Sequence, residues 1–448
     1  MLDTEIMTTP RNSPVADELF IVEHAADPTR RLVYVPLRSY LAAVPVEVAL
    51  ALTDQRPSRL KDSFRERVAA KPKVDIIEVL TALQHAPPEL SLAITDNCNL
   101  RCVYCHNSAG DPHKTGAMPR EVIRAVIDAY FSQVTSLPNE VCISFNGGGE
   151  PTFAHAELDF AINHALSAAA NVHKRVTFMM ATNGFYGDHI REYVVQHFRT
   201  VSLSLDGPAF IQNRHRPTAS GGDSFDRVHG TAKYFATHSF PFAFRATVSA
   251  FSLPHLRSVV DFIADEFPGR SVGLEHLNPF GRAERSIDPL VVPPDKSAFA
   301  DAIAGLIDYA KDRNVMILNS ASTEYNLVRP VFCTNIGVPN WTVSTTGEIV
   351  ACGRDKAPEL FVFGRFNRET GRVDIDRDRV DRLQSLNVLE YPECQDCFCK
   401  YHCAGGLSRQ TLGGQVRLRL HKAYCQTGPY EYSGWQISAH GGRYGLWR

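Results

Sequence analysis

The stretch Thr-Asp-Asn-Cys-Asn-Leu-Arg-Cys-Val-Tyr-Cys, residues 95–105, places three cysteines on one short segment. Cys98, Cys102 and Cys105 follow a C-x₃-C-x₂-C spacing, with a tyrosine just before the last cysteine. Three thiolates this close together can hold three irons of a [4Fe–4S] cube and leave the fourth iron open to a small molecule. The alternatives are three unrelated thiols or part of a zinc site, although zinc sites usually pair C-x₂-C motifs and close four ligands.

Composition narrows the class of protein. A length of 448 residues suggests two or three domains, and 44% hydrophobic with 21% charged residues is typical of a soluble globular chain. A formal charge of −2 does not indicate the basic surface that binds nucleic acid. No apolar run is nearly long enough to span a membrane. The first 18 residues lack the apolar core of a secretory signal. We therefore expect a cytoplasmic protein with neither a nucleic-acid nor a membrane partner.

The eleven cysteines fall into two groups. Three lie at 98–105 and seven lie between Cys333 and Cys425, while Cys142 stands alone within an apolar run. Cysteines in a cytoplasmic protein indicate metal or redox chemistry more often than disulfides. The distribution predicts two metal-bearing modules, with Cys142 as a small buried core residue.

Short apolar runs alternate with amphipathic stretches along the middle of the chain. The runs expected to form buried strands are 90–95, 141–145, 176–180, 201–205, 242–249 and 271–275. The helix-like stretches between them are 119–134, 157–170, 189–198, 225–235 and 253–267. This alternation predicts parallel βαβ units, so the fold class is α/β. The cysteine segment follows the first strand at its carboxyl end, where α/β barrels gather their active sites.

The chain divides by pattern into three segments. The pattern of residues 1–88 predicts a small α+β appendage. It contains a hairpin from 20–24 and 31–37, a helix at 39–52 and a charged helix or linker at 58–73. This appendage either docks a substrate peptide or caps the next segment structurally. Residues 89–320 then form the α/β segment, and residues 321–448 form a cysteine-rich domain.

Polar and glycine residues follow several predicted strands. The second strand runs into Phe-Asn-Gly-Gly-Gly-Glu-Pro-Thr at 145–152, where glycines let backbone approach a ligand closely. Ala-Thr-Asn-Gly at 181–184 and Ser-Leu-Asp-Gly-Pro at 204–208 follow the next two strands, as ligand contacts or as helix caps and turns. Asn-Arg-His-Arg-Pro at 213–217 supplies cations for a carboxylate. Glu275-His276 closes the sixth strand, where a ligand or substrate contact is expected.

The cysteine spacing, together with the glycine run, resembles the radical S-adenosylmethionine (SAM) superfamily. The resemblance implies a partial (β/α)₆ barrel of the TIM type. It also implies that Cys98, Cys102 and Cys105 hold a [4Fe–4S] cluster whose open iron binds the amino and carboxylate groups of SAM. One electron then splits SAM to give a 5′-deoxyadenosyl radical. The resemblance places Gly148, Gly149 and Glu150 at the amino group of SAM, and Asn183, Ser204 and Asp206 near the cofactor or the substrate. One of the cations Arg216 and Arg245 would meet a carboxylate. The glycine run has one residue more than the commonest form of the family motif.

The later cysteines resemble the SPASM domain, a C-terminal extension that carries auxiliary [4Fe–4S] clusters. The resemblance assigns one cluster to Cys394, Cys397, Cys403 and Cys425. It assigns the other to Cys333 and Cys352. Cys399 is the candidate third ligand, because the fourth position of the second cysteine run falls on Leu407, which cannot bind iron. The sequence around Gly347 predicts a β-hairpin between Cys333 and Cys352. A zinc ribbon built on the C-x₂-C pair is the alternative.

Relatives with a SPASM domain act mostly on peptides and proteins, and they include peptide maturases and anaerobic sulfatase-maturating enzymes. The resemblance therefore implies oxidative modification of a peptide or protein side chain, with flavodoxin or ferredoxin as electron donor. Asp355 would accept the proton lost on oxidation, or is a surface aspartate. The alternatives are oxidation or rearrangement of a small molecule, and a zinc-stabilised binding module without catalysis.

Overall fold

The computed structural model describes residues 7–8, 18–23, 27–54, 59–114, 116–133, 138–285, 288, 291–319, 328–331, 334–351, 361–395, 397 and 400–404. The chain forms two compact units. One comprises Met1–His85, Ala321–Gly337 and Gln384–Arg448, and the other Ala86–Ser320 and Val338–Leu383. These two units differ from the three segments predicted with boundaries at 88 and 320, because residues 338–383 continue the sheet of the α/β segment.

Seven parallel strands lie side by side in chain order in the second unit. They are β5 (Leu90–Leu92), β6 (Glu140–Phe145), β7 (Arg175–Thr182), β8 (Thr200–Ser204), β9 (Phe242–Val248), β10 (Ser271–His276) and β11 (Met316–Leu318). The six predicted strands are confirmed, and β11 is an addition that the sequence pattern did not indicate. The α/β fold expected of a partial barrel is therefore present.

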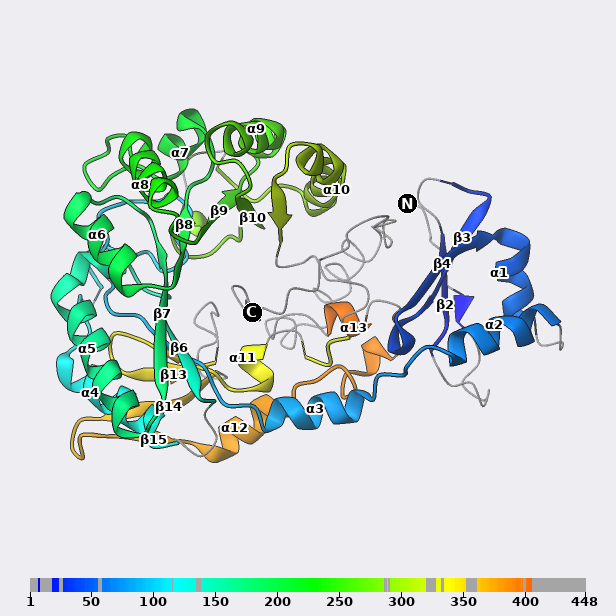
Figure 1. Cartoon of the computed structure of the whole chain (residues 1–448), viewed down its shortest axis with the longest axis horizontal. Helices are drawn as coiled ribbons and strands as arrows, with labels where there is room; N and C mark the ends of the chain where they lie inside the picture. Colours follow the sequence, from blue (N-terminus) through cyan, green and yellow to red (C-terminus); the bar gives the residue numbers. More distant parts are fainter. Residues whose placement is uncertain are drawn as a thin grey trace. The chain divides into compact units, whose positions relative to one another are not determined.

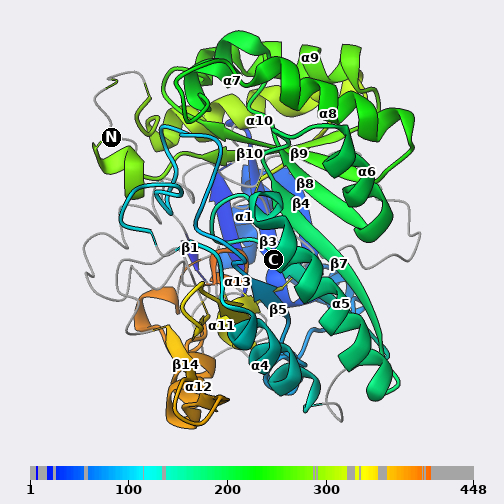
Figure 2. The same cartoon turned by 90° about the vertical axis from the view of Figure 1, so that its left-hand side faces the viewer.

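Helices cover the outer face of these strands (Figures 1 and 2). The helices are α4 (Arg120–Phe131), α5 (His155–Asn171), α6 (Asp188–His197), α7 (Ala209–His215), α8 (Phe225–Thr237), α9 (Leu256–Glu266) and α10 (Lys296–Asp312). Short 3₁₀ turns are η2 (Pro151–Ala154), η3 (Leu253–His255) and η4 (Gly281–Arg285). In α4, Val122, Ile123, Val126 and Ile127 are buried, as an amphipathic helix on a sheet requires.

The inner face of the strands is more open than the outer face. Along β6 the outward residues Val141 and Ile143 are buried, whereas Cys142 and Ser144 are half-buried. The same alternation leaves Arg245 half-buried on β9. The prediction that Cys142 is a core residue was therefore wrong. A strand in an open barrel packs only one of its two faces against helices, and Cys142 lies on the other.

Four antiparallel strands extend this sheet beyond β5. β12 (Trp341–Val343) pairs parallel to β5 and antiparallel to β13 (Glu348–Val350), which is followed by β14 (Val362–Asn367) and β15 (Arg372–Ile375). Gly347 has φ +88° at the turn between β12 and β13, so the predicted hairpin is confirmed. Helix α12 (Arg377–Gln384) follows. Cys333 and Cys352, which flank the hairpin, lie outside the described residues.

The first unit contains an antiparallel sheet in the order β1 (Met7–Thr8), β2 (Phe20–Glu23), β3 (Arg30–Val35) and β4 (Tyr40–Pro45). The short turn η1 (Pro36–Arg38) joins β3 to β4, and α1 (Val46–Thr53), α2 (Arg59–Ala69) and α3 (Ile76–Gln84) follow. The predicted hairpin and the helix within 58–73 are confirmed. The helix predicted over 39–52 is wrong in its first half, because Tyr40–Pro45 pairs with all six residues of β3. The uncharged run at 40–45 is compatible with a helix or a strand, and its pairing with β3 makes it a strand.

The C-terminal cysteine segment packs in this same unit. Cys394 and Tyr401 are buried with Leu37, Val328 and Val388 in one apolar cluster. Short helices here are α11 (Thr334–Gly337), η6 (Pro392–Cys394) and α13 (Lys400–Cys403). No helix among the described residues is both long and apolar enough to cross a membrane.

One buried ion pair joins the N-terminal segment to this cysteine segment. Lys400 is 2% exposed, and its ammonium contacts the Glu18 carboxylate and donates to the Gln395 carbonyl at 3.0 Å. The two chain segments therefore share one charge-paired core.

Replacing Glu18 with Gln should destabilise the first unit by about 2–3 kcal/mol, because a buried ammonium loses its counter-charge while Glu18 itself is 31% exposed. Hydrogen exchange of peptides from β2 to β4 measures the loss. The matched control is Glu23→Gln, since the Glu23 carboxylate is 54% exposed and 3.9 Å from Arg31. Its effect should stay below about 1 kcal/mol. Equal protection in the two variants would contradict a role for the Glu18–Lys400 pair.

Candidate functional site

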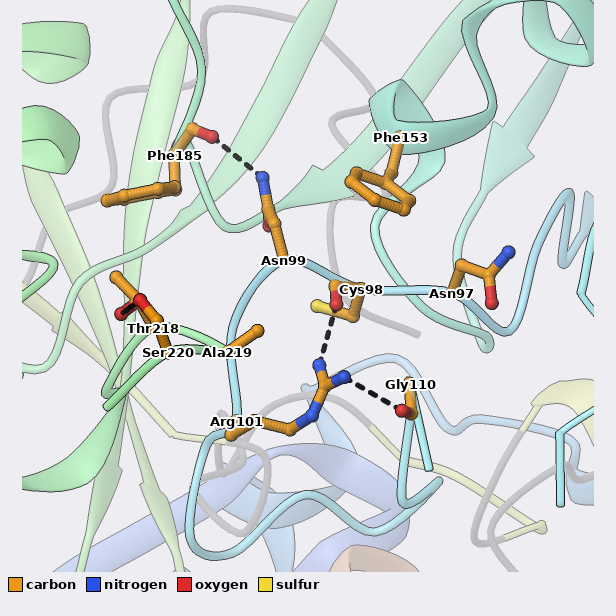
Figure 3. A pocket seen from close by; sticks show the side chains of 10 residues that line it. All are labelled: Asn97, Cys98, Asn99, Arg101, Gly110, Phe153, Phe185, Thr218, Ala219 and Ser220. Atoms are coloured by element: carbon orange, nitrogen blue, oxygen red, sulfur yellow. Dashed lines mark hydrogen bonds between the residues drawn. The ribbon is translucent and has the colours of Figure 1, made fainter. Parts of the chain in front are cut away.

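The three cysteines lie on one loop, which follows β5 and returns to the sheet before α4. Backbone bonds close this cysteine loop (residues 93–118): the Asp96 amide donates to the Gly116 carbonyl at 2.8 Å, and the Gly110 amide donates to the Asp96 carbonyl at 2.7 Å. Arg101 lies across the loop and donates to the carbonyls of Cys98 at 2.7 Å and Gly110 at 2.8 Å (Figure 3). The loop is thus shaped by its own hydrogen bonds.

The glycine run packs directly against the backbone of the cysteine loop. The Gly149 amide donates to the Thr95 carbonyl at 2.5 Å, and the Glu150 amide donates to the Asn97 carbonyl at 2.9 Å. A Cβ atom on Gly149 would lie 1.9 Å from the Asn97 oxygen, and one on Gly148 would lie 2.3 Å from the Thr95 oxygen. Neither position can carry a side chain without moving the loop, so the structure itself accounts for both glycines.

Glu150 joins the ends of β6 and β7. Its buried carboxylate accepts from the Thr152 hydroxyl and the Thr182 hydroxyl, each at 2.8 Å, and from the Asn183 amide at 2.7 Å. Burial raises the pKa of Glu150, and these hydrogen bonds oppose the rise. The Asn183 side chain in turn donates to the Asn99 side chain at 2.8 Å and lies 3.6 Å from the Cys98 sulfur. The predicted residues Glu150 and Asn183 are therefore brought to the first cysteine.

Asp206 is the centre of a buried polar network after β8. Its carboxylate accepts from the Tyr104 hydroxyl, from Arg216 at 3.1 Å and from the Thr247 amide at 3.0 Å, and it lies 2.9 Å from His215 Nδ1. Burial alone would raise the pKa of Asp206, but the Arg216 guanidinium and the His215 bond hold that pKa well below its usual range. Tyr104 and His215 were not singled out as site residues in the sequence, although both belong to its quoted motifs.

Arg216 faces the cysteines as well as Asp206. Its Nη1 lies 3.9 Å from the Cys102 sulfur, and its guanidinium carbon lies 5.3 Å from the centre of the Tyr104 ring. Its Nε is buried and has no hydrogen-bond partner in the described part of the chain. Arg216 was expected to bind a cofactor carboxylate, and the structure commits one edge of its guanidinium to Asp206. Of the other nitrogens, Nη1 faces the Cys102 sulfur and Nε keeps an N–H without a partner among the described residues.

Burial raises the pKa of the Cys102 thiol to about 12 and that of the Cys98 thiol to about 11, with Arg216 opposing the rise at Cys102. At neutral pH these cysteines can bind as thiolates only if positive charge is added beside them. An iron–sulfur core provides that charge, and its binding releases the thiol protons. The burial, the unpartnered Arg216 donor and the glycine contacts all fit a cluster held by this loop.

A single metal ion fits less well. Among the described residues, no three His, Cys, Asp or Glu side chains are placed to share one ion. Zinc needs four donors around one centre, whereas a [4Fe–4S] cube takes one thiolate per iron and so tolerates thiols that are farther apart.

The turn η4 holds the far side of the cysteine loop. Arg282 donates to the Cys102 carbonyl at 2.8 Å, contacts the Ala109 carbonyl and pairs with Asp111 at 3.0 Å. Gly281, at φ +57°, lies so close that a Cβ would be 2.4 Å from the Cys105 oxygen. Sequence reasoning missed Arg282, because nothing local marks a residue 177 positions beyond the last cysteine of the motif as its neighbour.

The other predicted rim residues line the inner face of strands β8 to β10. Ser204 pairs with Arg245 across β8 and β9, and Glu275 pairs with Thr247 across β9 and β10. All four are half-buried. The ring of His276 bonds to the Pro294 carbonyl at 2.9 Å, and burial lowers its pKa. This inner face presents hydroxyls and both signs of charge.

The described residues place few of the predicted auxiliary ligands. Cys394 is buried at the end of η6, and Cys397 is half-buried, with its amide donating to the Cys394 carbonyl at 3.1 Å. The backbone of Cys403 ends α13. The remaining residues of this prediction lie outside the described residues: Cys333, Cys352, Asp355, Cys399, Leu407 and Cys425.

Comparison with known proteins bears on the second unit. Residues 92–252 match the model of the radical SAM superfamily. A cysteine-type anaerobic sulfatase-maturating enzyme of Clostridium perfringens is 27% identical over 187 residues, which are 40% of this chain and 50% of that protein. An AdoMet-dependent heme synthase of Methanosarcina barkeri is 24% identical over 212 residues, 46% of this chain and 55% of that protein. The chain thus spans about half the length of these curated relatives.

A solved structure described as native anSMEcpe with bound AdoMet and Cp18Cys peptide has the same fold. It matches with a TM-score of 0.54 at 17% identity and covers 76% of this chain and 97% of its own. Proteins of the radical SAM superfamily use a [4Fe–4S] cluster and SAM.

Replacing Asp206 with Asn should lower the free energy of unfolding of the iron-free chain by about 3–5 kcal/mol, because Arg216 becomes a buried charge without a partner. The control is Asp188→Asn, whose carboxylate pairs with Arg191 but is 84% exposed. That change should cost less than about 1 kcal/mol. Urea unfolding followed by circular dichroism measures both.

The pH dependence is a second check on Asp206. A carboxylate whose pKa falls on folding stabilises the fold above its unfolded pKa of about 3.9 and loses that contribution only as the pH drops toward the folded pKa. The stability gap between the wild type and Asp206→Asn should therefore stay constant from about pH 5 to 8. A gap that closes within this range would contradict the depressed pKa.

Proposed function

We propose that this chain, in which residues 92–252 form a radical SAM domain, oxidatively modifies a side chain of a peptide or protein. One observation carries the proposal. The loop holds three half-buried cysteines, and the Asp206–Arg216 pair contacts one of them, within a domain related to sulfatase-maturating enzymes. The reaction would begin with abstraction of a hydrogen atom and end with loss of a second electron and a proton.

Cys98, Cys102 and Cys105 would hold the cluster, and Arg216 would place its Nη1 beside Cys102 and offer its Nε–H to an anionic group. Bound together, the cluster and SAM supply a 5′-deoxyadenosyl radical once one electron is delivered. Tyr104 and Asp206 would keep the loop and Arg216 in register, because the Tyr104 hydroxyl and the guanidinium bond to the same carboxylate.

SAM itself would contact the ends of strands β6 to β9. The Gly148 carbonyl accepts from the Asn107 side chain at 3.2 Å and keeps a second lone pair, which suits an ammonium. We assign Gly148, Gly149 and Glu150 to the amino group of SAM, and Asn183 and Ser204 to its hydroxyls or adenine. Arg245, on the inner face, is the cation offered to a carboxylate of SAM or substrate.

The substrate would enter along the inner face of the strands. Ser144, Ser204, Arg245 and Glu275 give this face hydroxyls and both charges, which suits the polar backbone of a peptide better than an apolar molecule. A relative with this fold has been solved with a peptide bound, which supports the same class of substrate here. Docking of the substrate peptide on the N-terminal segment stays one of the two predictions for residues 1–88, the other being a structural cap.

Auxiliary clusters would receive the second electron. We assign one to Cys394, Cys397, Cys403 and Cys425, and a second to Cys333, Cys352 and Cys399. Asp355 stays a predicted proton acceptor. The cytoplasmic location, and the absence of nucleic-acid and membrane partners, remain predictions from the sequence.

A second candidate is oxidation or rearrangement of a small molecule. It is favoured by the AdoMet-dependent heme synthase, which aligns with 46% of this chain. A zinc-stabilised binding module is disfavoured by the match to the radical SAM model and by the placement of the thiols.

Changing Cys98, Cys102 and Cys105 together to Ala should abolish 5′-deoxyadenosine formation while leaving auxiliary iron in place, because the triplet belongs to the second unit whereas Cys394 and Cys397 belong to the first. Liquid chromatography measures the nucleoside and a colorimetric assay measures iron. The matched control is Cys142→Ala, which removes a thiol from the inner face and should leave both readouts near wild type. Continued formation of 5′-deoxyadenosine by the triple variant would refute the assignment.

The substrate class separates the two candidates. A peptide encoded beside the gene should lose two hydrogens, about 2 Da by mass spectrometry, only when enzyme, SAM and reductant are all present, as expected for a net two-electron oxidation. A small molecule that changes under the same conditions while all such peptides stay intact would favour the second candidate.

A further inference from the structure

A pocket of about 430 Å³ opens beside the first cysteine of the loop (Figure 3). Its walls come from the cysteine loop, η2, the end of β7 and the segment that precedes α8. The lining residues are Asn97, Cys98, Asn99, Arg101, Gly110, Phe153, Phe185, Thr218, Ala219 and Ser220. None of them belongs to the inner face of strands β8 to β10, so this pocket is distinct from the proposed substrate path.

The walls of the pocket combine exposed aromatic surface with a polar rim. Phe153 is 55% exposed, and Figure 3 shows its ring and that of Phe185 on either side of Asn99 above Cys98. Asn97, Asn99, Thr218 and Ser220 supply hydrogen-bonding groups around the rings. Exposed aromatic anchors within a polar rim are typical of protein–protein contact sites rather than of a monomer surface.

The charged side chain that lines the pocket is a cation. Of the ten lining residues only Arg101 is charged, and its hydrogen bonds go to the carbonyls of Cys98, Leu100 and Gly110 rather than to a carboxylate. The Arg227 guanidinium lies 5.1 Å from the centre of the Phe185 ring at the same wall. A partner that docks here should therefore be acidic, because complementary charge steers encounter and fixes orientation.

We propose that this pocket docks a small acidic electron-carrier protein with a flavin or an iron–sulfur cluster at its surface. The inference rests on the proposed function, since it concerns how the cluster at Cys98 receives its electron. Cys98 and Phe153 line the same pocket, so a prosthetic group placed against Phe153 would lie beside a cysteine that would hold the cluster. The carrier is oxidised by one electron and the cluster is reduced by one electron, and no bond forms or breaks.

The size of the site suits such a partner. Redox encounters use small interfaces, commonly below about 1,200 Å² in total, and they depend on few anchors. Phe153 projects from the short turn η2, where its side chain is exposed and its backbone amide donates to the Glu150 carbonyl at 3.0 Å. Removing the ring should thus weaken docking without altering the cysteine loop.

The test compares two reductants in the full chain with its iron reconstituted. Phe153→Ser should leave 5′-deoxyadenosine formation with dithionite unchanged, because dithionite needs no docking site. With reduced flavodoxin, and in parallel with a reduced [4Fe–4S] ferredoxin, the rate should fall about tenfold or more, as expected for loss of an aromatic hot spot. Phe210→Ser is the matched control, since Phe210 is 49% exposed on α7 and contacts Phe251 and His255 instead of the pocket.

A binding measurement gives a readout that does not depend on turnover. Calorimetric titration of the iron-free full chain with each carrier should show weaker binding to Phe153→Ser than to the wild type or Phe210→Ser, and added salt should weaken wild-type binding. Unchanged binding and unchanged carrier-driven rates in Phe153→Ser, for both carriers, would overturn the docking site. Absence of 5′-deoxyadenosine from the wild type with dithionite would instead overturn the proposed function.

Discussion

The buried pair of Asp206 and Arg216 is the interaction on which the site depends. Taking two charges out of water is unfavourable unless each is fully satisfied, and here the carboxylate receives donors from the cysteine loop, α7, the residue after α7 and the backbone of β9. Four separate parts of the chain are thereby fixed to one group. The guanidinium is then aimed at Cys102 by charge and not by apolar packing, and that orientation requires every one of those partners.

The cysteine loop is otherwise held through its backbone. Gly148 and Gly149 approach the carbonyls of Thr95 and Asn97. Arg101 donates to the carbonyls of Cys98 and Gly110, and Arg282 donates to the carbonyl of Cys102. Contacts of this kind leave the thiols themselves uncommitted. They also place guanidinium groups around the site, of which Arg282 pairs with Asp111 and Arg216 with Asp206.

The sequence predicted the α/β sheet well, because the periodicity of apolar residues indicates each buried strand and each amphipathic helix locally. It also located Cys98, Glu150, Asn183 and Asp206 near one another, since the carboxyl ends of successive parallel strands meet at one edge. It did not find Tyr104, His215 or Arg282 as site residues, because their importance lies in partners that are distant along the chain. It misassigned Tyr40–Pro45 for the same reason: a strand on its own looks like part of a helix until its neighbour in the sheet is known.

The pairing of β12 with β5 has a consequence for the order of events in the cell. β5 carries the cysteine loop, yet one of its two edges is completed by Trp341–Val343, about 250 residues later in the chain. At a synthesis rate of 5–20 residues per second, that neighbour emerges from the ribosome roughly 12–50 seconds after β5 itself. During that interval the edge of β5 that Trp341–Val343 completes is without this partner, so the strand that leads into the cysteine loop takes its final place in the sheet late in synthesis.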